Sequence, residues 1–161
     1  MRGKRILGID PGSGKLGLGL IEIIKGKPHL IHYDCITTTP NSPEPQKLSF
    51  IYYEIVKRLN EIKPDLMAIE TLFFARNITS AFSVGQARGV VLLAAAQANI
   101  EVVEIAPLRL KKVLLGNGNA KKKDVQNFIR HYFNIDEKKK LGDDAADAVA
   151  IALSQVFLVA N

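Results

Sequence analysis

Five short apolar stretches constrain the fold of this chain more than any other feature. The predicted strands are Arg5–Asp10, Leu16–Ile24, Leu30–Thr38, Leu66–Glu70 and Glu101–Ile105. Short turns at 11–14 and 26–28 join the first three, which favours an antiparallel meander. A predicted helix precedes each of the last two, and such crossovers connect parallel strands. This order predicts a five-stranded mixed sheet of the α/β class with helices on both faces.

Helical spacing of apolar residues marks the segments between and after these strands. The predicted helices are Leu48–Ile62, Asn77–Asn99, Pro107–Leu115, Ala120–Phe133 and Asp144–Phe157. Residues 40–45 are predicted to be loop, and Pro64 ends the first helix. The second helix is apolar nearly all round from Val90 to Ala98, so we expect it to be covered on more than one side. Without a repeat or a linker, residues 1–161 are expected to form a single domain.

Composition narrows the class of protein. Hydrophobic residues make up 47% and charged residues 24% of the 161 residues, as in an ordinary folded globule. No apolar run approaches the ~20 residues of a membrane helix. Cys35 is the only cysteine, which excludes an internal disulfide and a cysteine-based zinc site and makes a reducing cytoplasm the expected location. The net charge of +6 favours a polyanionic partner, although many basic proteins bind none.

Four carboxylates stand where the predicted fold can bring them together. Asp10 and Glu70 each close a buried strand. Asp144 and Asp147 lie three apart on the last helix, so their side chains project from nearly one face. Taken singly, Asp10 is also an ordinary turn former before Pro-Gly, and Asp143 or Asp144 also suits an N-terminal cap. Capping does not explain Asp147, which lies among alanines with no lysine or arginine within one turn of the helix.

Grouped carboxylates require positive charge nearby. Two of them ~4 Å apart repel by ~4 kcal/mol at an effective dielectric near 20, and hard oxygen ligands favour Mg²⁺ or Mn²⁺ over zinc. Two such ions ~3.5–4 Å apart can activate water on one side of a phosphodiester and stabilise the leaving oxygen on the other. The sequence has no obvious Ser–His–Asp or Cys–His arrangement, and its three histidines lack ligand spacing. If the four acids belong to a metal site, the rest of the protein carries a charge of +6 − (−4) = +10. A basic body around an acidic pocket is what a nuclease needs.

The segment GIDPGSGK at 8–15 also suggests two phosphate-binding interpretations. It is not a P-loop, because the spacing is wrong and Lys15 is followed by Leu16 instead of serine or threonine. Asp-x-Gly after a first strand also resembles the phosphate loop of actin-like ATPases. Those proteins need a second phosphate loop and an adenosine subdomain, for which the chain has no room.

Three sequence blocks resemble the RuvC family of bacterial Holliday junction resolvases. They are ILGIDPGSGKLGLGLIE (6–22), AIETLFFARNITSAFSVGQARGVV (68–91) and GDDAADAVAIAL (142–153). The resemblance implies a ribonuclease H-like fold, a homodimer, and Mg²⁺-dependent nicking of two opposing strands of a four-way junction, and we expect 5′-phosphate ends. It also implies the RuvA–RuvB branch-migration complex as a partner. The family's four catalytic, metal-holding acids match Asp10, Glu70, Asp144 and Asp147, with Asp143 an extra acid beside the motif.

The resemblance also implies DNA contacts. Phe73 matches an aromatic residue that stacks on a base, a contact worth ~1–3 kcal/mol, although core packing is the alternative. Lys111 matches a phosphate contact. The family's turn G-x-G-x-A-acid-Lys matches 116–122, where Lys121 replaces the acid, so Lys122 is the formal match and a solvated helix end is the alternative. The remaining candidates are Phe74, Arg76, Arg88, Lys112, Lys121 and Lys123.

Ser80–Asn99 corresponds to the family's dimer element. The small residues Ala81, Gly85 and Gly89 permit close approach of a partner, though they could equally pack on the sheet. A two-fold dimer suits the approximate two-fold symmetry of a junction. Two rival functions stay open: a ribonuclease H-like nuclease or RNA-processing relative with a different substrate, and a structural junction-binding protein whose acids no longer catalyse. The four acids argue against the second.

Overall fold

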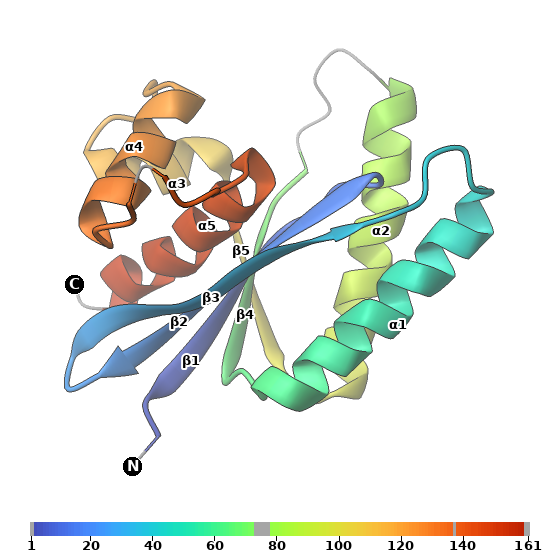
Figure 1. Cartoon of the computed structure of the whole chain (residues 1–161), viewed down its shortest axis with the longest axis horizontal. Helices are drawn as coiled ribbons and strands as arrows, with labels where there is room; N and C mark the ends of the chain where they lie inside the picture. Colours follow the sequence, from blue (N-terminus) through green and yellow to red (C-terminus); the bar gives the residue numbers. More distant parts are fainter. Residues whose placement is uncertain (1, 73–77, 137, 160–161) are drawn as a thin grey trace.

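The five strands form one mixed sheet in the order β3-β2-β1-β4-β5. They are β1 (Lys4–Asp10), β2 (Lys15–Ile24), β3 (Lys27–Thr37), β4 (Leu66–Glu70) and β5 (Glu101–Ile105). β2 pairs antiparallel with β1 and β3, whereas β4 pairs parallel with β1 and β5. The computed structural model, which describes residues 2–72, 78–136 and 138–159, thus confirms the predicted meander and parallel crossovers (Figure 1).

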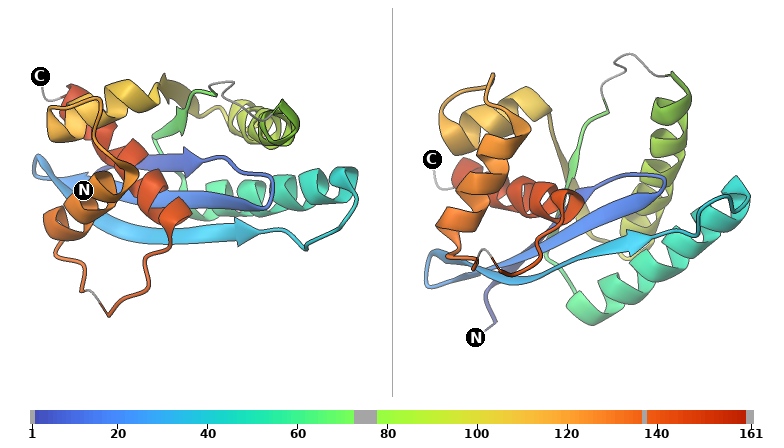
Figure 2. Two further views of the ribbon diagram at one scale, coloured as in Figure 1. Left: turned by 90° about the horizontal axis from the view of Figure 1, so that it is seen from above. Right: turned by 45° about the horizontal axis from the view of Figure 1, so that its top comes forward.

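Helices cover both faces of this sheet, as predicted. They are α1 (Glu44–Ile62), α2 (Ile78–Gln97), α3 (Pro107–Leu115), α4 (Lys122–Tyr132) and α5 (Asp143–Val159). α1 and α2 lie side by side on one face, while α5 lies on the other with α3 and α4 around it (Figures 1 and 2). Among the described residues, no helix is long and apolar enough to cross a membrane.

The helix α1 begins earlier than predicted. Glu44 and Pro45 belong to its first turn, with Pro43 at the N-cap, although residues 40–45 were expected to be loop. Proline is compatible with the first turn because the amide it lacks has no helical partner there. The apolar spacing on which the prediction relied starts only at Leu48, so it could not reveal this turn. The predicted end is confirmed, since Lys63 adopts a left-handed conformation just before Pro64.

The expectation that α2 is covered on more than one side is wrong for the single chain. Ala87, Val91 and Ala94 are buried against the sheet and α1, but Phe82 is 66% and Leu93 52% exposed. Helix α2 therefore has one covered side and one outer side that carries large apolar residues.

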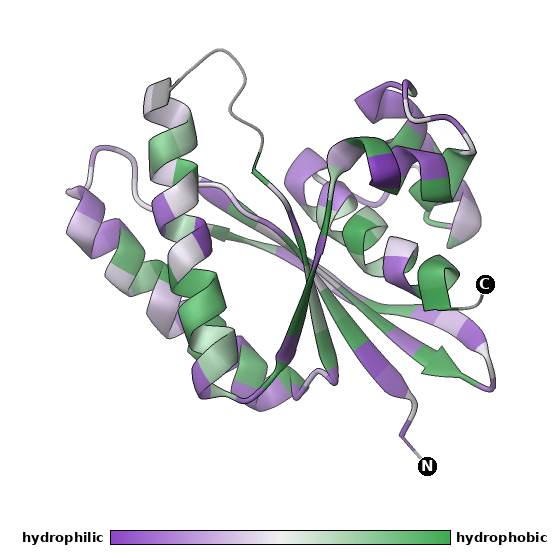
Figure 3. Ribbon diagram, turned by 180° about the vertical axis from the view of Figure 1, so that it is seen from behind, coloured by the Kyte–Doolittle hydropathy of each residue, from purple (hydrophilic) through white to green (hydrophobic). Residues whose placement is uncertain are grey.

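Alternation along the strands divides the core into two clusters, because successive side chains point to opposite faces. The residues facing α1 and α2 include Leu7, Ile9, Leu18, Leu20, Met67 and Ile69. Those facing α5 include Ile6, Ile21 and Ala68. Figure 3 shows the hydrophobic residues on the strands and on the helices that cover them. Asp10 and Glu70 share their strand face with Ile6 and Ala68, so the sheet directs both acids toward α5.

Candidate active site

Two acids stand at neighbouring strand ends. Asp10 ends β1 and Glu70 ends β4, and the parallel pairing of these strands sets Ile9 opposite Ile69 immediately before them. Both carboxyl groups are partly buried. Parallel neighbours that end at the same edge bring their last side chains together, so the predicted juxtaposition of these two acids is confirmed.

Asp147 joins this pair across a cavity of about 280 Å³. The polar residues that line the cavity are Asp10, Glu70, Lys111, Lys122 and Asp147. Its apolar lining comes from α3, α4 and α5 and includes Leu110, Val125 and Ile151. The cavity is therefore enclosed by three helices and the ends of two strands that are distant in sequence.

Asp144 lies at the edge of this group. It lines a neighbouring cavity of about 590 Å³ together with Lys15, Cys35 and Asp143. Its negative charge nevertheless contributes to raising the pKa values of Asp10 and Asp147. The four predicted acids thus form one electrostatic cluster that spans two adjoining cavities.

Asp10, Glu70 and Asp147 hold protons more tightly than ordinary carboxyl groups, because the pKa of each is raised. Burial raises the pKa of Asp10 to about 7, assisted by the charges of Asp147, Glu70 and Asp144, while Lys122 opposes the shift. The pKa of Glu70 is also raised, first by burial and then by Asp147. A buried carboxyl group whose pKa is raised has too little positive charge around it to offset burial. Such raised pKa values are typical of functional sites.

Lys122 supplies the cationic partner that the sequence around Asp147 lacks. Its Nζ lies 2.6 Å from Oδ2 of Asp147 and reaches it from α4. Burial alone would lower the pKa of Lys122, but the hydrogen bond and charge of Asp147, with Asp10 and Asp143, outweigh it and raise that pKa. The pKa of Asp147 is still raised, because burial and the neighbouring acids outweigh Lys122. One lysine does not neutralise the cluster.

The donor set fits a hard divalent cation. All four acids offer oxygen ligands, and the pKa of Asp10 is raised by burial and then by neighbouring negative charges that a cation would neutralise. Within the described residues, however, no three histidine, cysteine or acidic side chains lie close enough to hold an ion as they stand. The chemistry of the site suits Mg²⁺ or Mn²⁺, while the ion pair between Lys122 and Asp147 occupies one of its carboxylates.

The other predicted contacts fall into four groups. Lys111 lines the acidic cavity, whereas Lys112, Lys121 and Lys123 are exposed outside it. Arg88 is tied to Glu104 of β5 at 2.7 Å with its side chain 16% exposed, so this arginine holds α2 against the sheet. The predicted DNA contacts that lie outside the described residues are Phe73, Phe74 and Arg76.

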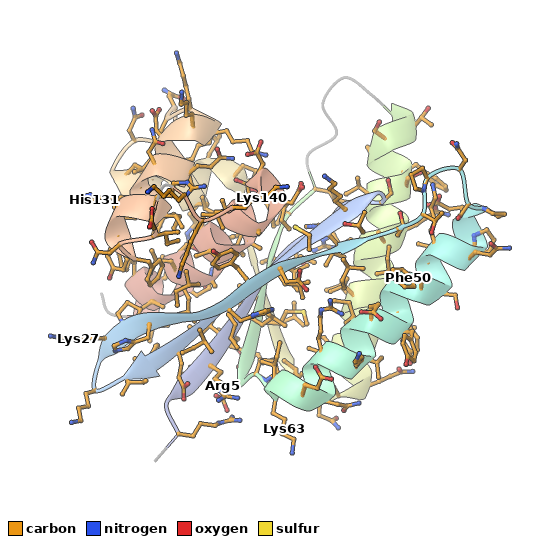
Figure 4. All side chains as sticks on the ribbon, viewed as in Figure 1. Arg5, Lys27, Phe50, Lys63, His131 and Lys140 are labelled. Carbon is orange, nitrogen blue, oxygen red and sulfur yellow. The ribbon has the colours of Figure 1, made fainter. Side chains whose placement is uncertain are left out.

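Several lysines are exposed outside the acidic cavity. Lys27, Lys63 and Lys140 are exposed on three different parts of the chain (Figure 4). The sequence patterns did not indicate the apolar wall of the cavity or the proximity of Cys35 to Asp144. Burial raises the pKa of the Cys35 thiol, and the charge of Asp144 contributes after it. Helical spacing marks Val125 and Ile151 as buried, but spacing alone cannot show that they line a site.

Comparison with known proteins decides the family. The family model described as "Crossover junction endodeoxyribonuclease RuvC" matches residues 6–155. The chain belongs to the RuvC family. RuvC of Desulfitobacterium hafniense is 46% identical over 154 residues, covering 96% of this chain and 93% of that protein. RuvC of Thermotoga maritima is 45% identical over 148 residues, covering 92% and 88%.

Solved RuvC structures share the architecture. Thermus thermophilus RuvC superposes with a TM-score of 0.86 at 33% identity, covering 97% of this chain and 95% of that one. The same protein in complex with Holliday junction substrate gives a TM-score of 0.84 at 31% identity, covering 98% and 95%. The chain has the ribonuclease H-like α/β fold that its sequence resemblance implied.

Proposed function

We propose that this protein is a metal-dependent endodeoxyribonuclease that resolves four-way (Holliday) DNA junctions in recombination and repair by paired symmetric nicks. Membership of the RuvC family and the Thermus relative's junction complex support this function. The observation that carries it is the convergence of Asp10, Glu70 and Asp147 on one cavity, with Asp144 beside them. Residues 1–161 would form a single cytoplasmic nuclease domain.

The four acids are proposed as the metal ligands and catalytic residues. They would hold two Mg²⁺ ions per subunit, with Mn²⁺ able to substitute, and bound ions activate water and stabilise the leaving oxygen. Asp10 must lose its proton to act as a ligand, and its pKa of about 7 makes this loss dependent on pH near neutrality. The products would carry 5′-phosphate ends.

Lys111 and Lys122 are proposed to admit the DNA backbone to this acidic cavity. Both line it, so they place two positive charges where the acids alone would repel a phosphate. Lys112, Lys121 and Lys123 would extend the contact on the exterior, together with Phe73, Phe74 and Arg76. Each phosphate contact of this kind steepens the salt dependence of binding, since it releases condensed counterions.

Two copies of the chain would act together. The outer side of α2 exposes Phe82 and Leu93, and the small residues Ala81, Gly85 and Gly89 lie on the same helix. Pairing through this side gives a two-fold homodimer whose two sites address two equivalent strands of a junction. The RuvA–RuvB branch-migration complex is proposed as the further partner.

A substrate panel tests the function. The protein is incubated with labelled four-way junction, linear duplex and RNA–DNA hybrid, each with Mg²⁺ or with a chelator. We expect paired, ligatable nicks in the junction with Mg²⁺ and intact DNA in every other reaction. Cleavage of the hybrid would instead identify a nuclease with another substrate. Binding of the junction without cleavage in Mg²⁺ would identify a structural protein.

Asp144→Asn separates binding from chemistry. The amide keeps the size of the side chain but removes its charge, so cutting should stop while the junction still binds. Gel-shift and cleavage assays on the same preparation measure both. Undiminished cutting by this variant would remove Asp144 from the catalytic set.

A further inference from the structure

The sheet face beneath the N-terminal half of α5 is built from glycine around Asp10. Gly17 is the residue directly opposite Asp10 in the β1–β2 pair, and Gly8, two residues before Asp10, is opposite Gly19. Directly opposite residues of an antiparallel pair project from the same face, as do residues two apart on a strand. Asp10 is therefore surrounded on its own face by three positions without side chains.

Helix α5 uses the space that these glycines leave. A Cβ placed on Gly17 would lie 2.0 Å from the carbonyl oxygen of Asp144, and one on Gly8 would lie 2.0 Å from that of Ala148. A Cβ on Gly19 would lie 2.5 Å from the amide nitrogen of Val149. All three obstacles are backbone atoms of α5, which cannot rotate away as a flexible side chain can.

Gly17 is present for space and not for backbone conformation. Its φ lies outside the left-handed range, whereas Gly26 and Gly116 do adopt positive φ. An alanine could therefore adopt the backbone angles at position 17. Real Cβ atoms stay at least 3.0 Å from such an oxygen, so its methyl group would displace the first turn of α5 or the strand by about 1 Å.

We propose that Gly17 is a positioning residue that sets the separation between Asp10 and the acids of α5. It touches α5 at Asp144 itself and lies across the strand pair from Asp10, so a single position controls the distance between acids from two elements. A metal site tolerates displacements of only ~0.5 Å, and a misplacement of about 1 Å can cost about 100-fold in rate. The inference rests on the proposed function, because the separation matters only if these acids share divalent ions.

The test compares Gly17→Ala with variants that destabilise the opposite face. Mn²⁺ binding is measured by calorimetry, junction cleavage by initial rate, and folding by circular dichroism and Tm. Gly17→Ala should bind Mn²⁺ at least about tenfold more weakly, cleave about 100-fold more slowly, and lose several degrees of Tm. The controls are Ile51→Val and Ile51→Ala, at a buried position of α1. Their losses of Tm should lie below and above that of Gly17→Ala. Both should bind Mn²⁺ as the parent protein does.

The outcomes separate the two proposals. Unchanged Mn²⁺ affinity in folded Gly17→Ala, or an equal loss in the matched Ile51 variant, would overturn the positioning role and leave the proposed function intact. A parent protein that neither binds Mn²⁺ nor cuts junctions would overturn the proposed function. If Gly17→Ala does not fold, Gly19→Ala lifts the same helix one turn further along. It should also weaken Mn²⁺ binding, and unchanged affinity would reject the role.

Discussion

The two faces of the sheet use opposite kinds of residue to hold their helices. On the face covered by α1 and α2, the strands present large aliphatic side chains such as Leu7, Ile9 and Leu20, which are at most 4% exposed. On the face covered by α5, glycines let the helix backbone touch the strands directly. Both faces bury apolar area, and the α5 face includes Ile6 and Ile21, but only on that face does the helix backbone lie against glycines.

The pKa values of partly buried carboxyl groups also shift in opposite directions on the two faces. Beneath α1, a cavity of about 370 Å³ contains Asp34, Glu54 and Arg58. Nη2 of Arg58 lies 2.9 Å from Asp34, and Nη1 bonds Glu54. Burial would raise the pKa of Asp34, but hydrogen bonds from Arg58 and the Cys35 amide outweigh it and lower that pKa. Beside α5, the pKa of Asp10 moves upward instead. Cavity size does not distinguish the faces. The difference is that hydrogen bonds outweigh burial at Asp34, whereas at Asp10 burial dominates and the neighbouring acids add to it.

Asp10→Asn should give the largest effect, because it removes the carboxylate that interacts with all three of the other acids. Removing a metal ligand forfeits several kcal/mol of transition-state stabilisation, so junction cleavage should fall about 10³-fold or more. Thermal stability in chelator should rise, since a buried carboxylate surrounded by like charges is removed. Initial rates and Tm measured on one preparation check both. Cleavage above a tenth of the parent rate would contradict the assignment.

Ile55→Ala tests the opposite face at a residue that is 0% exposed. Truncation of a buried isoleucine leaves a cavity and should cost about 2–5 kcal/mol of unfolding free energy. Cleavage per folded molecule should stay within about twofold of the parent, as the altered side chain lies across the sheet from the acids. Urea unfolding and active-site-normalised rates measure the two quantities. A comparable loss of specific activity would show that the faces are not independent.

The pH dependence of stability should carry the signature of Asp10. Its pKa is about 7 in the folded chain against 3.8 ordinarily, so between these values only the folded state keeps the proton. Unfolding then releases a proton, and stability in chelator falls as pH rises from about 4 to about 7. The shift corresponds to at most about 4 kcal/mol. We expect a loss of about 2 kcal/mol, because Asp10 titrates together with the neighbouring acids and is partly solvated.

Comparison with Asp10→Asn isolates this contribution. The variant should show a flatter decline of unfolding free energy over the same pH interval, measured by urea titration in chelator. Identical slopes for the parent and the variant would mean that Asp10 titrates normally.

Arg58→Met should have the smallest effect. It tests the α1 face, where Arg58 compensates the charges of the partly buried carboxylates. It removes two partly exposed ion pairs on the α1 face, with side-chain exposures of 20% for Arg58 and 42% for Asp34. The expected loss of stability is about 1 kcal/mol, smaller at high salt, with no change in junction cleavage. Urea midpoints at low and high salt provide the measurement. A rate change would link this cluster to the site.

The periodicity of each segment and the order of elements along the chain were predictable because they depend on local sequence. Short apolar runs marked all five strands, and Asp10 and Glu70, the carboxylates that close two of them, indicated the edge at which these strands end. Local patterns failed where a neighbour decided the outcome. The first turn of α1 lacks apolar residues, so apolar spacing could not reveal it. The exposure of Leu93 depends on which elements pack against α2, and the sequence around this residue does not show that.

The amino-acid sequence by itself determined the order of elements and the RuvC resemblance, which implies the four acids as metal ligands, because both depend on residue types at short spacings. Only the tertiary structure decided that Lys122 pairs with Asp147, that Asp144 lines the adjoining cavity, and that Gly17 adjoins Asp144. These contacts join elements far apart along the chain. Such distances depend on how closely a helix can approach a sheet, which packing sets and no local pattern records.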